Sequence, residues 1–321
     1  MTKYFTVQEV AALKRLRERF LNRTAGERDY WRSEDELALY DSTFGERIGW
    51  KWDAVLAELV RRGWSPRSRR LIDWGCGSGI AGRRAIAAWP QFEQIALHDR
   101  STLAVAFAQA RLQVMHPTVA VRRLDPAATG GLLLVSHVAN ELPPATLAAL
   151  LAQAARCDDV IWVEAGTHED SRQLSGIREQ LMATGLSVVA PCTHQARCGM
   201  LVPENEQHWC HHFAAPPQEA FRDARWAEFG RGLGIDLRSL PYSFLVLSRT
   251  PAALAPGWSR VIGEPREAKG FMRVLSCQAE GVAEFMLQKR DAPELYRAFH
   301  KGSAAAVQRW TLEAGKIKAA E

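Results

Sequence analysis

Several features common in other classes of protein are missing from this chain of 321 residues. It contains no run of 18 apolar residues, so we expect no membrane-spanning helix. Its start, MTKYFTVQEVAALKRLRERF, is a charged amphipathic pattern without the apolar core of a secretory signal. Internal repeats and low-complexity segments are also absent. These absences favour a globular protein of the cytoplasm.

Cysteine is scarce, with six residues in the chain. In a reducing cytoplasm such cysteines are expected to be ligands or buried residues rather than disulfides. Three of them lie in PCTHQARCGMLVPENEQHWCHHF (191–213), together with four of the nine histidines. The usual zinc-binding pair C-x2-C is absent, and His208 and His212 match only the short H-x3-H spacing. The cluster therefore needs an explanation of its own.

The charge and composition of the chain do not identify a binding partner. Apolar residues make up 47% of the chain, which is enough for a sizeable core, and the net charge is +5. A mild basic excess is typical either of a solvated surface or of a protein that binds a polyanion such as RNA. Arginine far outnumbers lysine, which suits bidentate phosphate recognition but can also reflect genomic base composition.

From about residue 69 the chain alternates between short apolar segments and helical patterns. Strands are expected at RLIDWG, QIALHD, VAVRRLD, LLLVSHV, DVIWVEAG and LSVVAPC, and after an irregular excursion at YSFLVLSR (242–249). Strands separated by helices of about 10–15 residues predict a parallel, doubly wound α/β sheet. The last of the seven strands is expected to run antiparallel to the others.

The pattern predicts three regions. Residues 1–65 form an N-terminal helical region, with a polar middle stretch that is looped or partly helical and with no catalytic signature. Residues 66–250 form the α/β domain, with a cysteine-rich insertion at 190–215. Residues 251–321 form a small β appendage, and from about 302 an alanine-rich tail that we expect to be helical or frayed.

The segment LIDWGCGSG carries Asp73, Gly75, Gly77 and Gly79 between the first strand and a helix. Glycines at alternate positions let the backbone turn tightly and approach a ligand closely. The spacing G-x-G-x-G differs from the G-x-G-x-x-G of dinucleotide-binding folds. With the preceding acid it resembles motif I of S-adenosylmethionine-dependent methyltransferases. That resemblance implies a seven-strand Rossmann-like methyltransferase sheet that binds S-adenosylmethionine.

Further cofactor-binding candidates end the next strands. Asp99 ends the second strand, where a carboxylate can accept hydrogen bonds from both ribose hydroxyls. Leu124 and Asp125 end the third strand, where the adenine amino group needs an acceptor. Helix capping by Asp99 and turn formation by Asp125 are the structural alternatives.

No catalytic group stands out. The Asn/Asp-Pro-Pro-aromatic loop of amino-group methylases is absent, and NELPP (140–144) resembles it only remotely. Pro191-Cys192 has the dipeptide of cytosine-C5 enzymes but lies on the wrong strand. Asn140 and Glu141 are weak catalytic candidates because they follow the fourth strand. Methyl transfer can also proceed by positioning alone.

The cysteine segment has the spacing C-x5-C-x11-C, and a further cysteine, Cys277, lies far downstream. Thiols gathered in a segment rich in polar residues, proline and glycine suggest a metal, although cysteines can also be buried core residues. Structural zinc takes four thiolates, or three thiolates and an imidazole. A [4Fe–4S] cluster takes four thiolates.

The segments APCTHQARC, HWCHHF, PYSFLVL, RVIGEP, VLSCQAEG and QKR resemble the ribosomal small-subunit assembly methyltransferase-like family, which has bacterial and mitochondrial members. The resemblance covers about residues 30–300. It implies a methyltransferase fold, a link to small-subunit rRNA and ribosome assembly, and a [4Fe–4S] cluster, with zinc as the alternative. Carried over by motif, the metal ligands are Cys192, Cys198, Cys210 and Cys277. Cys76 and Cys157 are read as non-ligands.

The chain departs from the family pattern at Thr193 and Gly199, which replace prolines, and by an extra histidine after Cys210. Every thiol is kept. A metal joining the cysteine segment to the appendage would order a surface able to grip rRNA backbone. The basic residues expected there are Arg260, Arg266, Arg273, Lys289 and Arg290. The histidines expected beside the ligands or facing RNA are His194, His208, His211 and His212.

Three functions remain open. The first is an S-adenosylmethionine-dependent methyltransferase that acts on small-subunit rRNA or the 30S particle. The second is a non-catalytic ribosome assembly factor that binds rRNA. The third is a small-molecule methyltransferase with structural zinc, which the basic appendage disfavours.

Overall fold

A computed structural model describes residues 4–22, 29, 31–250 and 256–321. Parts of the predicted helical region (1–3, 23–28 and 30) and the first residues of the predicted appendage (251–255) lie outside the described residues.

Contacts divide the chain into two units. Unit 1 comprises 1–164 and 214–240, and unit 2 comprises 165–213 and 241–321. The boundaries of these units differ from the predicted ranges 1–65, 66–250 and 251–321. Those ranges rest on the sequence pattern alone, and the division into three regions stays a prediction.

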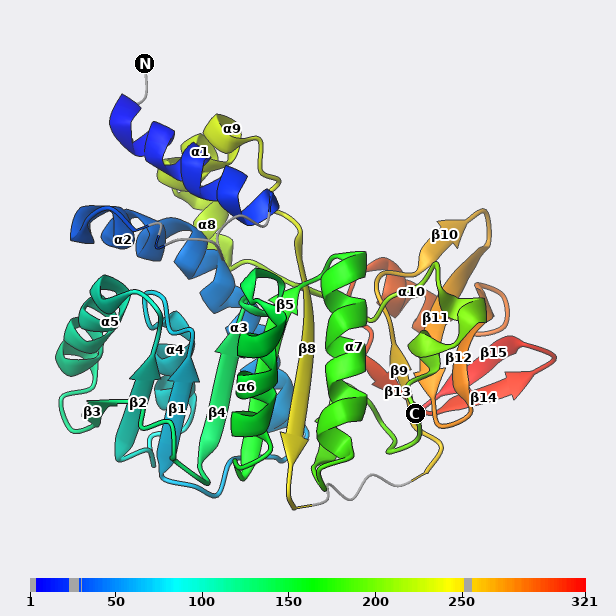
Figure 1. Cartoon of the computed structure of the whole chain (residues 1–321). Helices are drawn as coiled ribbons and strands as arrows, with labels where there is room; N and C mark the ends of the chain where they lie inside the picture. The colour runs from blue at the N-terminus through cyan, green and yellow to red at the C-terminus, as the bar shows by residue number, and fades with distance from the viewer. Residues whose placement is uncertain (1–3, 23–28, 30, 251–255) are drawn as a thin grey trace. The chain divides into compact units, whose positions relative to one another are not determined.

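Unit 1 contains five parallel strands in the order β3-β2-β1-β4-β5, and Figure 1 shows the first four side by side. The strands are β1 (Arg70–Trp74), β2 (Gln94–His98), β3 (Ala120–Arg123), β4 (Leu132–Ser136) and β5 (Asp159–Ala165). The helices between them are α4 (Ile80–Ala88), α5 (Thr102–Met115) and α6 (Pro144–Ala154). This alternation confirms the predicted doubly wound α/β fold.

The central strands are buried on both faces. Leu132, Leu133 and Leu134 of β4 are fully buried, as are Val160 and Ile161 of β5. Strands of a parallel sheet covered by helices on both sides read as continuous apolar runs rather than as alternating patterns. This burial explains why the strand segments were recognisable in the sequence.

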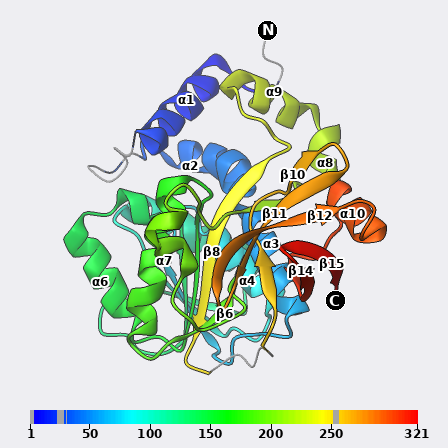
Figure 2. The same ribbon diagram turned by 90° about the vertical axis from the view of Figure 1, so that its right-hand side faces the viewer.

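Two groups of helices belong to unit 1 besides the crossovers. The first comprises α1 (Val7–Leu21), α2 (Glu34–Tyr40), the π-helix η1 (Asp41–Gly45) and α3 (Glu46–Arg61). The second comprises α8 (Gln218–Arg222) and α9 (Ala224–Leu233). Figures 1 and 2 both show α1 beside α9, and the backbone of Tyr4 donates to Glu228.

Of the two alternatives for the polar stretch, looped or partly helical, the structure shows the helical one, since the chain runs as helix from α2 through η1 into α3. Among the helices that the structure describes, none combines the length and apolarity of a membrane-spanning segment.

In unit 2, β6 (Ser187–Ala190) runs antiparallel to β8 (Leu240–Ser248). This pairing confirms the expected antiparallel last strand. The strand β7 (His212–Ala214) of the cysteine-rich segment also pairs with β8, and it is a strand beyond the seven that the sequence predicts. The helix α7 (His168–Met182) precedes β6.

The rest of unit 2 is a second sheet in the order β13-β9-β11-β12-β15-β14, with β10 on β11. Figure 2 shows its long strands β11 and β12 together. The elements are β9 (Ser259–Val261), β10 (Arg266–Ala268), β11 (Phe271–Gln278), β12 (Gly281–Gln288), α10 (Pro293–His300), β13 (Val307–Gln308), β14 (Trp310–Glu313) and β15 (Lys316–Ala320).

The expectation of a helical or frayed tail is wrong. Residues 310–320 form the hairpin β14–β15, which turns at Ala314 and Gly315 with φ of 48° and 74°. Positive φ at both turn residues matches the right-handed twist of the paired strands. β15 also pairs in parallel with β12, and this burial of Ile317 outweighs the helix propensity of the alanines.

The hairpin generates a stability prediction. Ile317 is fully buried, so Ile317→Ala is expected to lower the free energy of unfolding by about 2–5 kcal/mol. The control is Leu312→Ala in β14, whose side chain is 39% exposed and should cost about 0.5 kcal/mol or less. Urea denaturation followed by circular dichroism measures both. Equal small effects would mean that the tail is not packed in the sheet.

Candidate cofactor site and cysteine cluster

The glycine loop between β1 and α4 adopts a conformation that favours glycine. Gly75, Gly77 and Gly79 have φ of 71°, 51° and 79°. A β-carbon on Gly75 would lie 2.6 Å from Val138 Cγ1, and one on Gly79 would lie 2.9 Å from Ala108 Cβ. A β-carbon on Gly77 would meet nothing within 4 Å. The loop is thus packed at both ends and open in the middle, where a ligand can approach the backbone.

Asp73 of β1 is hydrogen-bonded to α4, the helix that follows the glycine loop. Its side chain is 1% exposed, and Oδ2 accepts a hydrogen bond of 3.1 Å from the Gly82 N–H of α4. Oδ1 is buried without a hydrogen-bond partner among the described residues. Burial raises the pKa of Asp73 to about 7, against the opposing effect of the Gly82 bond. This carboxyl therefore joins β1 to the start of α4.

Asp99 is joined directly to the loop. Its Oδ2 accepts from the Gly77 N–H and its Oδ1 from the Ser101 N–H, both at 2.9 Å. Burial raises the pKa of Asp99, and these two hydrogen bonds oppose that rise. Each carboxylate oxygen keeps a further lone pair for a ligand. The N-cap of α5 is Ser101, whose hydroxyl accepts from the Ala104 N–H, so Asp99 does not cap this helix, and its contact with the ribose stays a prediction.

The remaining predicted cofactor residues differ in how far they are engaged. Asp125 is exposed, and its Oδ1 accepts from the Ala127 N–H at 2.9 Å, which is the turn formation anticipated as an alternative. Leu124 is half-buried and its N–H donates to Leu97. Their contact with adenine stays a prediction.

Asn140 and Glu141 lie in a short 3-10 helix, Ala139–Glu141, that follows β4. Burial raises the pKa of Glu141 to about 7, and Glu164 and Asp99 raise it further while Arg100 lowers it. A carboxyl with such a pKa can hold or release a proton near neutral pH.

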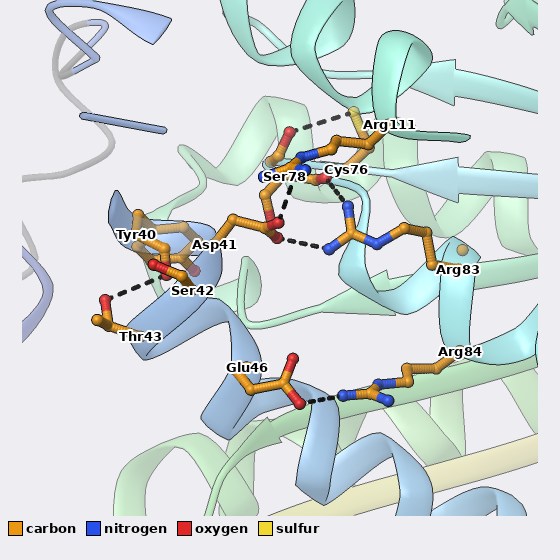
Figure 3. Close-up of polar contacts among 12 residues, drawn as sticks. Tyr40, Asp41, Ser42, Thr43, Glu46, Cys76, Ser78, Arg83, Arg84 and Arg111 are labelled. Carbon is orange, nitrogen blue, oxygen red and sulfur yellow. Dashed lines mark hydrogen bonds and ion pairs between the residues drawn. The ribbon is translucent and has the colours of Figure 1, made fainter. Parts of the chain in front are cut away.

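The π-helix η1 holds the loop from the other side, as Figure 3 shows. Arg83 of α4 donates to the Ser78 carbonyl at 2.7 Å and to Asp41 Oδ1 at 2.5 Å. Arg83 and Asp41 are both buried, and Arg111 Nε lies 3.8 Å from Asp41 Oδ2. π-helical turns are frequent at functional sites.

Sequence reasoning had found no catalytic signature in the N-terminal helices and so missed this support. Tyr40, which precedes Asp41, was missed as well. Burial raises the pKa of Tyr40, and the charges of Glu141, Asp41 and Asp99 raise it further. Figure 3 shows Tyr40 next to Asp41. The signal in the sequence was weak: an acid and an aromatic residue inside a helical pattern.

Unit 2 brings the four predicted cysteine ligands into one neighbourhood. Cys198 and Cys277 share a buried cluster with Met200 and Ile262, and Cys210 packs against it. Burial raises the pKa of the Cys277 thiol well above its ordinary value, and the charges of the three other cysteines, Cys192 among them, raise it further. Among the described residues, none of the six cysteines forms a disulfide. Within the described ranges, no group of three or more Cys, His, Asp or Glu side chains that could hold a metal ion is present.

Two buried arginines lie beside these thiols. Arg178 of α7 donates to the Ala196 carbonyl at 2.9 Å, and the charges of Cys192 and Cys198 raise its pKa although burial, the largest influence, lowers it. Arg260 of β9 is 3% exposed and interacts with Cys210. These guanidinium groups place positive charge beside the thiols.

The burial of Arg260 corrects its expected place on an RNA-binding surface. It points inward to His212, with 3.1 Å between Nη2 and the ring Nδ1. Arg266 and Arg273 are exposed, but both pair with Glu284, so their charge is partly neutralised. An isolated basic patch on these residues is therefore weaker than the sequence suggested.

The HWCHHF motif has two faces because the segment is extended. Cys210 and His212 face inward, with 3.7 Å between Sγ and Nε2. Trp209 and His211 stack on the other side, with ring centroids 4.6 Å apart. His194 Nε2 lies 3.5 Å from Cys277 Sγ. Hence His194 and His212 lie beside predicted ligands, whereas His211 packs on an aromatic ring.

Comparison with known families identifies the family of this chain. Residues 52–308 match the model described as mitochondrial small ribosomal subunit Rsm22. The chain belongs to the Rsm22 family. No curated protein sequence matches it. This membership confirms the resemblance predicted from the cysteine motifs.

Solved structures similar to this Rsm22-family chain include methyltransferases. Magnesium protoporphyrin IX methyltransferase ChlM from Synechocystis, with bound S-adenosylhomocysteine, has a TM-score of 0.38 at 14% identity, covering 75% of this chain and 100% of its own. The pyocyanin biosynthetic protein PhzM has a TM-score of 0.40 at 14% identity, covering 75% of this chain and 69% of its own.

The support of the glycine loop by η1 generates a prediction. Asp41→Asn leaves Arg83 buried without its carboxylate, so the free energy of unfolding should fall by about 3–5 kcal/mol. The matched control is Glu46→Gln, which removes the partly exposed pair with Arg84 and should cost about 0–1 kcal/mol. Chemical denaturation of both variants measures the difference. Equal losses of the free energy of unfolding in the two variants would show that the Arg83–Asp41 pair stabilises the fold no more than a partly exposed ion pair does.

Proposed function

We propose that this Rsm22-family protein is an S-adenosylmethionine-dependent methyltransferase that acts on small-subunit rRNA during ribosome assembly. The observation that carries the proposal is the hydrogen bond from the Gly77 N–H to Asp99. It places a carboxylate at the end of β2 beside the open part of the glycine loop, at the carboxyl edge of a parallel sheet where such folds bind nucleotides.

The residues of this edge have distinct proposed roles. Gly75, Gly77 and Gly79 would let the cofactor approach the backbone, and Asp99 would accept from its ribose hydroxyls. Bound S-adenosylmethionine would supply an electrophilic methyl group. Glu141, with a pKa of about 7, could accept the proton that an amine loses on methylation.

The small-subunit partner follows from the family description. A protein related to a small ribosomal subunit component is expected to meet rRNA or the 30S particle. One observation favours a second candidate, a non-catalytic assembly factor: NELPP (140–144) lacks the aromatic residue of the Asn/Asp-Pro-Pro-aromatic loop of amino-group methylases. In that case the bound cofactor would stabilise the conformation of the assembly factor without giving up its methyl group.

The proposal predicts methyl transfer to the small subunit. Wild-type protein with radiolabelled S-adenosylmethionine should label purified 30S particles or naked 16S rRNA. Asp99→Asn should reduce kcat/KM by about 10–100-fold, because a hydrogen bond to a charged group is worth roughly 1.5–3 kcal/mol. Asp236→Asn is the control, since that exposed carboxylate accepts from the Arg238 N–H of its own turn and belongs to no predicted site.

Three outcomes distinguish the functions. Labelled rRNA that depends on Asp99 supports the methyltransferase. S-adenosylhomocysteine binding with salt-sensitive rRNA binding, but no label, supports the assembly factor. Absence of both cofactor and rRNA binding overturns both candidates.

We also propose that Cys192, Cys198, Cys210 and Cys277 hold a [4Fe–4S] cluster. Four thiols in one neighbourhood, with Arg178 and Arg260 beside them, support the proposal because thiolate ligation creates buried negative charge that these cations would stabilise. The cluster would link the cysteine segment to β11 within unit 2. Structural zinc is the alternative ligand for the same thiols.

The cluster proposal predicts metal content. Protein purified without oxygen should contain about four irons and four sulfides per chain. Cys277→Ser should lose most of the iron, because it removes the ligand from β11. Cys157→Ser is the control, since this buried thiol belongs to unit 1 and donates to the Gln153 carbonyl. One zinc and no sulfide would overturn the cluster while keeping the thiol site.

A further inference from the structure

The residue that follows β4 has an unusual backbone. His137 has φ of 55°, in the left-handed region that side chains other than glycine seldom adopt. Its N–H donates to the Val163 carbonyl of β5 at 2.9 Å, so the sheet holds this conformation in place. Strained residues of this kind are concentrated at ligand-binding and catalytic sites.

Helix α3 fixes the side chains at this point. Lys51 Nζ lies 3.1 Å from His137 Nε2, and the next residue, Trp52, donates from Nε1 to Ser136 Oγ at 2.9 Å. Trp52 is fully buried. Two consecutive residues of a helix therefore contact two consecutive residues at the end of a strand, which fixes the direction of the imidazole ring.

This contact determines which ring nitrogen carries the proton. A protonated lysine amine only donates, so Nε2 of His137 accepts from Lys51. Burial lowers the pKa of His137 well below its ordinary value, and the charge of Lys51 lowers it further. The imidazole is neutral, and its single proton lies on Nδ1.

The Nδ1 atom is buried and has no hydrogen-bond partner among the described residues. Buried polar groups are nearly always hydrogen-bonded, so an orphaned donor indicates a group that a ligand completes. The next residue, Val138, lies against Gly75 of the glycine loop, and the Val138 and Ala139 N–H groups donate to the buried Glu164. His137 thus belongs to the same edge of the sheet as the loop.

We propose that His137, oriented by Lys51, donates a hydrogen bond from Nδ1 to a carboxylate or carbonyl oxygen of a ligand bound at this edge. The inference rests on the proposed function, which gives that oxygen two sources. One is the carboxylate of the cofactor's methionine moiety. The other is a carbonyl of the methyl-accepting base. His137 is in either case a positioning residue that aligns the two reactants.

The test uses two variants of His137. His137→Gly removes the imidazole and adopts the positive φ without strain. His137→Asn also tolerates this backbone and keeps an N–H donor near the position of Nδ1, so it should restore function. Lys51→Met should lose the preference for a proton on Nδ1, which ring ¹⁵N chemical shifts of labelled histidine report directly.

The probes are S-adenosylhomocysteine and 5′-methylthioadenosine, which lacks the amino-acid moiety, measured by calorimetry on the full chain. If the oxygen is the cofactor carboxylate, His137→Gly weakens S-adenosylhomocysteine binding by roughly 10-fold and leaves 5′-methylthioadenosine binding unchanged. If it is a base carbonyl, both affinities stay constant and KM for 16S rRNA rises. In both cases His137→Asn recovers most of the loss.

The inference is overturned if the wild-type ring carries its proton on Nε2. It is also overturned if the wild type binds S-adenosylhomocysteine while His137→Gly changes neither the affinities nor the kinetics. A wild type that binds no S-adenosylhomocysteine overturns the proposed function itself, and this inference with it. The unfolding midpoints of the variants show whether any loss comes from misfolding.

Discussion

The buried pair of Arg83 and Asp41 is the interaction on which unit 1 depends. One guanidinium joins the π-helix to the Ser78 carbonyl of the glycine loop, so the N-terminal helices and the loop hold one another. A loop with three residues at positive φ has little intrinsic preference for one conformation. External support of this kind makes the loop rigid, and a rigid loop keeps Asp99 at the open side of Gly77.

Local physics explains why much of the fold was predictable. The central strands β4 and β5 are buried on both faces, so each appears as an apolar run, whereas β3 is mostly exposed and contains two arginines. The glycine loop was recognisable because its backbone conformation restricts three alternate positions to glycine. The thiols were recognisable because three of the six cysteines and four of the nine histidines fall within residues 191–213, and unit 2 does gather the four cysteines.

What remained hidden depends on contacts between distant residues. Arg83 meets Asp41 across 42 positions, and Lys51 meets His137 across 86. No local sequence pattern predicts pairs between residues so far apart in the chain. Arg260 looked like a surface cation, but β9 is so short and so covered that all its residues are buried. The alanines of the tail favoured helix until pairing with β12, a tertiary effect, determined the outcome.

The chain passes between the two units three times, at 164/165, 213/214 and 240/241. Neither unit is therefore finished when its first segment leaves the ribosome. Cys192, Cys198 and Cys210 emerge well before Cys277, and at ~5–20 residues per second the delay lasts several seconds. During synthesis these three thiols stand without the strand that encloses them. On the proposal that the four thiols hold a metal, loading before β11 is made would meet an incomplete ligand set, and the order of translation would delay maturation until the second sheet is made.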